Sequence, residues 1–326
     1  MKAKLFVTMA AATMILAGCS NDENEPVDNW NGEIRLSSGV TTQTRANTQA
    51  TQIQSGEFVY VWADKAPATP DHIKAWTLTA GSSNDFTGNP QYYPTDGSNL
   101  DFYALHGNFA PGAFMENTTE FPTTAIVHSV EADQSNTDMK NYAKSDLLYA
   151  VKKDVARSSS VVQLPFYHML SKVEVALKSG DGNPNLTGAT VTIVGTQLKA
   201  DFTLDKDVTM TEQSARAAMI AITEGDNDAA PITVRTVTTN NFDTNTEYGE
   251  AVVLPKQTIN AKTAFIQVKL SNNAVFTYKI PDGEPLTLES GKKYTYKITV
   301  NQSGLTVTSE IKDWTSEVKT GNAEMD

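Results

Sequence analysis

Apolar and polar residues alternate with a period of two along most of the chain, and no long stretch repeats every 3.6 residues. In one such row Val173, Val175 and Leu177 face one way, with Lys172 and Glu174 on the opposite side. Successive side chains of a β-strand point to opposite faces of its sheet. The pattern therefore predicts strands with an apolar face and a polar face.

Two further rows lie near the C-terminus, on either side of the turn-forming residues 301–304, Asn-Gln-Ser-Gly. The first row comprises Tyr294, Tyr296, Ile298 and Val300, and the second comprises Leu305, Val307 and Ile311. Two alternating runs joined by a short polar turn are typical of a β-hairpin. We expect this hairpin to have one buried face and one solvated face.

Other segments complete an all-β interpretation. Residues 57–62 (EFVYVW) are apolar on both faces, which predicts a central strand, and residues 264–270 form another apolar row. Only residues 211–221 favour a short helix. Short strands separated by Gly, Asn, Asp and Pro are typical of β-sandwiches. A serine-rich stretch, VARSSSVVQLP, predicts a domain boundary near residue 158.

The segment 33–49 raises a separate question. Ile34, Leu36 and Val40 alternate with polar residues as in a half-buried strand, yet the sequence then becomes a polar run that contains Arg45 and Ala46. Threonine, glutamine and asparagine around this bond favour an extended, solvated loop that a protease can reach. The sequence therefore predicts a strand followed directly by an exposed loop that contains the Arg45–Ala46 bond.

The N-terminus has the order of features of a secretory signal. Lys2 and Lys4 precede a short apolar run, and small residues lead to Cys19. The ending LAGC resembles the bacterial lipobox, in which the cysteine is diacylated and the peptide is cut before it. We therefore assign residues 1–18 to a signal peptide and Cys19 to lipidation. The acidic, unpatterned residues that follow fit a flexible tether. Ser20, directly after Cys19, resembles a signal that sorts lipoproteins to the outer membrane.

Composition narrows the class of protein. Hydrophobic residues make up 40% of the 326 residues and charged residues 20%, which is enough for a folded core. The net charge of −12 disfavours nucleic acid as a partner, because an acidic surface repels phosphates. The only cysteine is Cys19, so the body can form no intrachain disulfide.

Catalytic and metal-binding patterns are weak throughout. No two of the four histidines lie at metal-ligand spacing, and no Gly-x-Ser-x-Gly is present. Asp181 begins a run like that of a calcium loop, but the run lacks the sixth-position glycine and the closing glutamate. No predicted strand brings two carboxylates together on one face. We therefore expect no catalytic residue, no metal and no cofactor.

Five blocks, in order, are similar to one known family. They are residues 58–64 (FVYVWAD), 91–107 (QYYPTDGSNLDFYALHG), 145–151 (SDLLYAV), 164–177 (LPFYHMLSKVEVAL) and 291–314 (GKKYTYKITVNQSGLTVTSEIKDW). Together they resemble the fimbrillin family, the type V pilins of Bacteroidales-type bacteria. The resemblance runs from about residue 19 to residue 314.

This resemblance implies two transthyretin-like β-sandwiches, at residues 46–157 and 158–326, after a lipidated propeptide at residues 19–45. It also implies export to the outer membrane, cleavage after Arg45 by an arginine-specific protease, and assembly with other subunits into fimbriae. Removal of Ile34, Leu36 and Val40 as a placeholder strand would leave an apolar groove and unpaired strand edges. A strand from another subunit could fill this groove by β-strand addition, head to tail.

The position of the subunit within the fibre stays open. The tail at residues 315–326 has few large apolar residues, so either the strand with Leu305, Val307 and Ile311 is donated or the subunit only accepts and lies at the tip. An alternative function is a surface glycan-binding lipoprotein for nutrient uptake. That protein would use Trp76, or Tyr92 and Tyr93, as a platform for sugar rings.

Overall fold

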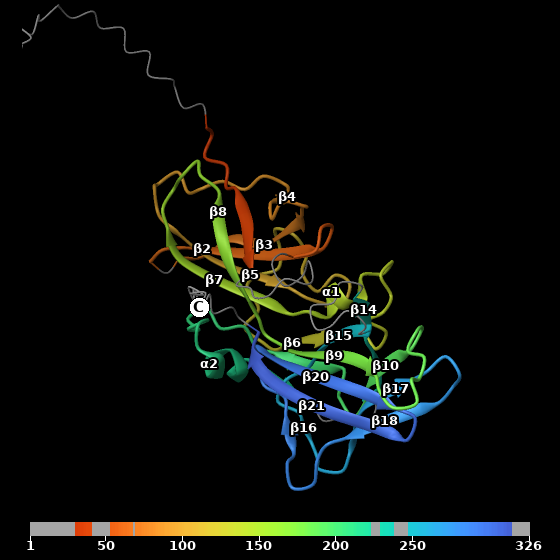
Figure 1. The fold of residues 1–326 in the computed structure, drawn as a ribbon. Helices are drawn as coiled ribbons and strands as arrows, with labels where there is room; N and C mark the ends of the chain where they lie inside the picture. The colour runs from red at the N-terminus through yellow and green to blue at the C-terminus, as the bar shows by residue number, and fades with distance from the viewer. Residues whose placement is uncertain (1–29, 41–52, 68, 223–228, 238–246, 315–326) are drawn as a thin grey trace, which may run out of the picture. The chain divides into compact units, whose positions relative to one another are not determined.

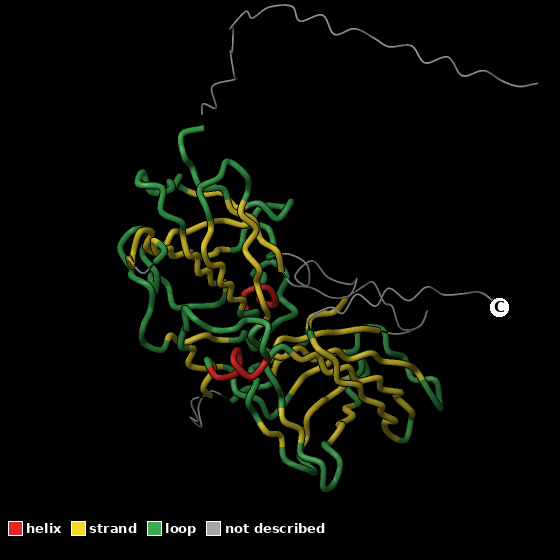
Figure 2. The backbone as a smooth tube through the Cα atoms, turned by 90° about the vertical axis from the view of Figure 1, so that its left-hand side faces the viewer, coloured by secondary structure: helices red, strands yellow, loops and turns green. Residues whose placement is uncertain are grey.

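The computed structural model describes residues 30–40, 53–67, 69–222, 229–237 and 247–314. The chain divides into a short unit, Met1–Asn31, and a body, Gly32–Asp326. The described part of the body consists of β-strands joined by loops and contains two short helices, α1 (Asn141–Ser145) and α2 (Gln213–Ala218), as Figure 2 shows. The all-β prediction is therefore confirmed, and α2 lies within the predicted helix at 211–221.

The largest sheet has seven strands, and it contains β1 (Leu36–Val40), the first strand among the described residues (Figure 1). Its order is β1, β8 (Val162–His168), β7 (Leu148–Val155), β5 (Leu100–His106), β2 (Phe58–Lys65), β3 (Thr69–Ala80) and β4 (Phe86–Gly88). The predicted central strand is β2, which pairs with β3 and β5 and buries Val59, Val61 and Trp62.

A second sheet of five strands includes the predicted C-terminal hairpin. Its order is β14 (Arg235–Val237), β15 (Glu247–Val253), β9 (Ser171–Ser179), β20 (Lys292–Asn301) and β21 (Gly304–Asp313). Tyr294, Tyr296, Ile298 and Val300 of β20 all point into the core, as expected. The second row differs, because Ile311 of β21 is 57% exposed and Leu305 and Val307 are only partly buried. β21 is the outer strand of the sheet, so its side chains meet fewer neighbours.

Three smaller sheets complete the described body. The first contains β13 (Ile232–Thr233), β10 (Thr190–Ile193), β17 (Ala264–Lys269) and β18 (Val275–Lys279). The second contains β12 (Ile220–Ile222), β11 (Lys199–Phe202) and β6 (Ile126–Ser129), and the third contains β16 (Thr258–Ile259) and β19 (Leu286–Thr287). The predicted boundary near residue 158 stays a prediction; β8 lies beyond it and belongs to the seven-stranded sheet.

The charged face predicted for β9 is buried, which is a correction to the simple alternation. Lys172 and Glu174 are each 4% exposed, although Val173 and Val175 fill the opposite, apolar face. Helix α1 packs on β15 next to them (Figure 1). The Arg235 guanidinium also lies 4.8 Å from the centre of the Tyr142 ring of α1. Both faces of the sheet are therefore covered around Lys172, whose ammonium pairs with the carboxylates of Glu174 and Glu250.

Candidate functional site

Strand β1 lies beside β8 and runs parallel to it. Leu36 is opposite Val162 and Val40 is opposite Phe166, with continuous register between them. The N–H of Val162 donates to the carbonyl of Arg35 at 2.8 Å. Because N–H groups alternate in direction along a strand, Pro165 falls at a position whose missing N–H would point away from β1. The proline therefore removes no hydrogen bond from this ladder.

The other edge of β1 is bonded to the segment 84–93, which contains β4 at the far end of the same sheet. Ile34 N–H donates to the carbonyl of Gln91 at 2.8 Å, and Ser38 N–H donates to the carbonyl of Asn84 at 2.8 Å. β1 therefore connects the two ends of the seven-stranded sheet. Its removal would leave polar backbone groups unpaired on both sides.

The side chains of β1 and of the residues before it are part of the core. Ile34, Leu36 and Val40 are 3%, 4% and 7% exposed. Burial of each such side chain is worth roughly 1.5–3 kcal/mol. Ser38 is also buried, although its hydroxyl reaches the Asn84 carbonyl only at 3.5 Å. The predicted strand is thus observed, with one polar residue at an inward position.

A cavity of about 350 Å³ lies beside residues 33–36, where the chain enters β1. Apolar side chains lining it include Leu36, Trp76, Phe86 and Val161. It lies where the segment 85–90 turns away from β1 to pair, as β4, with β3. β1 therefore does not fill all the apolar space beside it. We call β1's place between β8 and the segment 84–93 the β1 seat.

Several predicted site residues lie outside the described residues, namely Cys19, Arg45 and Ala46. Lipidation and cleavage stay predictions. The candidate donor residues Leu305, Val307 and Ile311 lie in β21, whose outer edge pairs with no strand among the described residues.

The structure buries two of the three rings, Trp76 and Tyr93, that the alternative glycan-binding function would need as a sugar platform. Trp62, Trp76 and Tyr93 are buried, and only Tyr92 is exposed, at 44%. The indole N–H of Trp76 donates to the carbonyl of Asn89 at 2.7 Å. These rings therefore serve core packing, and a lone tyrosine offers no stacking platform.

Two carboxylates do converge in the fold, one of them on β15, a strand that was not predicted from the sequence. Glu174 of β9 and Glu250 of β15 are opposite each other in register. The ammonium of Lys172 lies between them, 3.0 Å from Glu174 Oε1 and 2.6 Å from Glu250 Oε2. Sequence alone could not find this pair, because the two strands are separated by several others along the chain. The side chains are buried and neutralised, which suits structure rather than acid–base catalysis.

The run at Asp181, the other candidate position, contributes one carboxylate to a cavity of about 340 Å³ that Gln302 and Ser303 also line. The run at Asp181 is a turn that packs on the β20–β21 turn, where the Gln302 N–H donates to the Asp181 carbonyl at 2.8 Å. No group of three or more potential metal ligands occurs among the described residues.

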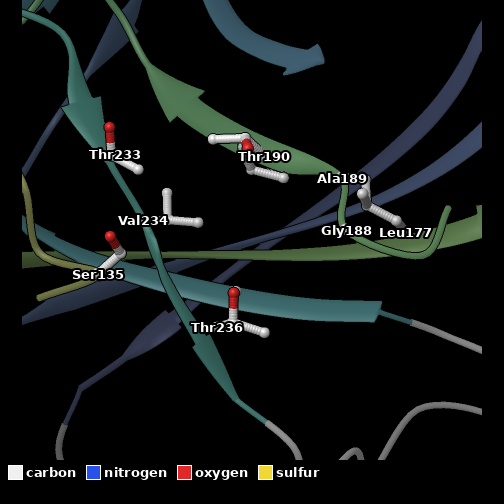
Figure 3. A pocket seen from close by; sticks show the side chains of 10 residues that line it. Ser135, Leu177, Gly188, Ala189, Thr190, Thr233, Val234 and Thr236 are labelled. Atoms are coloured by element: carbon white, nitrogen blue, oxygen red, sulfur yellow. The ribbon is translucent and has the colours of Figure 1, made fainter. Parts of the chain in front are cut away.

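A separate cavity of about 290 Å³ has no charged group among its described lining residues. Figure 3 shows hydroxyls of Ser135, Thr233 and Thr236 at this cavity, together with Val234. Hydroxyl and apolar side chains alone supply no acid, base or metal ligand at this place.

The fold and the β1 seat define an all-β protein in which β1 is held between β8 and the segment 84–93. The fimbrillin-like family model matches residues 44–314, and the chain belongs to this family. The family consists of structural subunits of fimbriae and not of enzymes, so the chain is a cell-surface protein of that class. Among the described residues, no helix has the length and apolar character needed to span a membrane.

Individual relatives agree with this assignment. Fim1C of Bacteroides uniformis, named "putative fimbrium subunit", is 25% identical over 339 aligned residues, which cover 99% of this chain and all of Fim1C. Two solved structures named "putative cell adhesion protein" share the fold. The one from Bacteroides uniformis has 19% identity, a TM-score of 0.57 and coverage of 87% of this chain and 98% of its own. The one from Bacteroides ovatus has 16% identity, a TM-score of 0.59 and the same coverages.

Proposed function

We propose that this chain is a fimbrial subunit that is exported as a lipoprotein on Cys19, cut between Arg45 and Ala46, and assembled by strand exchange at the β1 seat. The observation that carries the proposal is the double bonding of β1, to β8 on one side and to the segment 84–93 on the other. A cut at Arg45 would free β1 covalently and leave it held only by these contacts.

The physical consequence of losing β1 is an open groove. Three apolar side chains leave the core, and the ladders on both sides lose hydrogen bonds worth about 1 kcal/mol each. An extended strand from another molecule restores both by β-strand addition. Because donor and acceptor are different surfaces, the contact repeats head to tail and produces a filament. The same cut also releases the chain from its lipid.

The pattern of β21 supports a second copy of this chain as the donor. At every second position, both strands read apolar, apolar, serine, apolar. The inward set of the β1 segment is Ile34, Leu36, Ser38 and Val40, and the matching set of β21 is Leu305, Val307, Ser309 and Ile311. Ile311 is exposed at home, so it gains burial on transfer. A chain with both a seat and a matching strand suits a stalk position better than the tip.

Replacement Arg45→Ala should leave an uncut, membrane-bound precursor that enters no fibre, because β1 keeps its covalent link to the body. Fibres are purified and the N-terminus of the subunit is read by mass spectrometry, with Ala46 expected for the unmodified chain. Arg35→Ala is the matched control, since Arg35 is exposed beside β1 and its loss leaves the bond at 45–46 intact. Normal incorporation of Arg45→Ala would refute the processing step.

The register of the exchange can be trapped with cysteines, because the mature chain contains none. In β1, Ser37 lies opposite Gln163, and Thr308 takes the Ser37 position in the matched pattern. Chains carrying Gln163→Cys and Thr308→Cys should form covalent multimers under mild oxidation. Thr306→Cys with Gln163→Cys is the control, because it is displaced by roughly 6.6 Å along the strand and out of disulfide reach.

A second pair of cysteine substitutions should block assembly instead of trapping the assembled chains. Lys297 and Thr308 are register partners within the home hairpin, and both are exposed. Lys297→Cys with Thr308→Cys should close a disulfide inside one chain, hold β21 in place and stop assembly until a reductant is added. Fibres that form equally well with and without reductant would exclude β21 as the donor.

A further inference from the structure

The last described residue, Trp314, connects the two large sheets. It follows β21 directly and is 3% exposed. Its indole stacks on the imidazole of His168, with ring centres 3.9 Å apart and planes 11° from parallel. Its backbone N–H donates to the carbonyl of Gly291 at 2.6 Å. His168 is the final residue of β8, so one ring pair links the proposed donor strand to the strand that holds β1.

The imidazole of His168 is itself fixed in place. Its Nδ1 lies 2.8 Å from Oδ2 of Asp146, and both side chains are fully buried. Asp146 ends α1, where its N–H donates to the carbonyl of Ala143. The Nε2 of His168 has no hydrogen-bond partner among the described residues. The indole of Trp314 covers one face of this imidazole. Departure of Trp314 would therefore expose a buried ring to water.

β8 depends on β1 for most of its pairing. Its register with β1 runs from Val162 to Phe166, whereas its register with β7 is limited to Tyr167 and His168. When β1 leaves, β8 keeps only the short ladder at the end that carries His168. Movement of the freed residues 162–166 would then pivot on this end of β8, where Trp314 stacks on His168.

We infer that Trp314 is a positioning residue that keeps β21 paired within its own chain, and that β8 couples the release of β21 to the departure of β1. The donor strand then becomes free only in chains whose own seat has opened. This inference rests on the proposed strand exchange and adds its order: the cut comes first, opening of the seat follows, and donation comes last.

The test separates donor from acceptor. The acceptors are chains that have been cut after Arg45 and that carry Gln163→Cys. The donors carry Thr308→Cys and are used in two forms, one cut after Arg45 and one kept uncut by Arg45→Ala. All chains also carry Cys19→Ser. The formation of the mixed disulfide is followed on gels with time. Uncut donors should cross-link at least tenfold more slowly than cut donors. Trp314→Ala in the uncut donor should restore the rate of the cut donor, whereas Trp314→Phe, which keeps a ring over His168, should stay slow.

Two further variants complete the test: one excludes a general loss of stability, and the other disrupts the stack from the side of β8. Val61→Ala creates a core defect in β2, which β5 and β7 separate from β8 in the sheet, and the uncut donor that carries it should stay slow. His168→Gln removes the stack from the other side and should accelerate donation as Trp314→Ala does, which covers the case in which Trp314→Ala fails to fold.

Each remaining outcome has one meaning. Equal rates for cut and uncut donors, with cross-linking present, would overturn the coupling while strand exchange stands. Acceleration by Val61→Ala equal to that by Trp314→Ala would also overturn it. No cross-link between cut donors and cut acceptors would instead overturn the strand exchange itself.

Discussion

Replacement of Lys172 by alanine should lower the free energy of unfolding by about 3–5 kcal/mol, because it leaves two buried carboxylates without the cation between them. Glu250 is completely buried and lies 2.6 Å from the Lys172 ammonium. Its other cation, Arg235, is more distant, with 3.9 Å between Nε and Oε1. Glu174 keeps a contact to Lys293 at 3.4 Å, so most of the loss falls on Glu250.

The measurement is urea unfolding of the wild-type and variant chains at neutral pH, with the free energy extrapolated to water. Lys262→Ala is the matched control. Lys262 pairs with Asp282 at 2.9 Å, but the two side chains are 71% and 74% exposed, and such pairs contribute between 0 and about 1 kcal/mol. Equal small losses for Lys172→Ala and Lys262→Ala would contradict the view that burial makes the Lys172 pair strong.

Local patterns predicted the elements correctly where one strand or one turn decides them. Residues 57–62 became the interior strand β2 because they are apolar on both faces, and such a strand needs neighbours on both sides. Residues 213–218 became α2 within the predicted range. The β20 row lies in the core for the same reason, since alternation alone places its side chains on one face.

Features that depend on contacts between residues far apart in the sequence could not be predicted from local patterns. The alternation in β9 gave no sign that Lys172 and Glu174 would be buried. Trp76 and Tyr93 could be assigned to a surface or to the core only after the sheet around them was known. Ile311 shows the opposite error, because an apolar residue at the right spacing stays exposed on an outer strand.

The candidate site also has a part that the sequence predicted and a part that it could not predict. Ile34, Leu36 and Val40 were predicted from their spacing, and the structure buries them. Their two partners, β8 and the segment 84–93, come from distant parts of the sequence, and no local pattern identifies them. The stack of Trp314 on His168 is equally invisible, because it joins the ends of two strands that belong to different sheets.

Acidification should destabilise the chain through His128 by about 3 kcal/mol. His128 is fully buried, its Nδ1 accepts the N–H of Asn108 at 3.2 Å, and its Nε2 donates to the carbonyl of Ser145 at 3.0 Å. This arrangement requires the neutral ring, since a proton on Nδ1 would face another N–H. Burial accordingly lowers the pKa of His128 from 6.5 to about 4.

The direction of the effect follows from this lowered pKa. Above pH 6.5 the histidine is neutral in both the folded and the unfolded chain, and its contribution to stability is complete. Between pH 6.5 and about 4 the unfolded chain takes up a proton that the folded chain refuses, so stability falls. Below about pH 4 both states bind the proton, and the loss stops increasing.

Urea unfolding at pH 7 and at pH 4 should therefore give a smaller difference for His128→Gln than for the unmodified chain, because the amide cannot titrate. Carboxylates also titrate in this range, but they are common to both chains and cancel in the comparison. His72→Gln serves as the control, since His72 lies at the surface and its ring bonds the carbonyl of Tyr92. An unchanged pH dependence in His128→Gln would assign the acid sensitivity to groups other than His128, and the buried neutral ring would then contribute no pH-dependent stability.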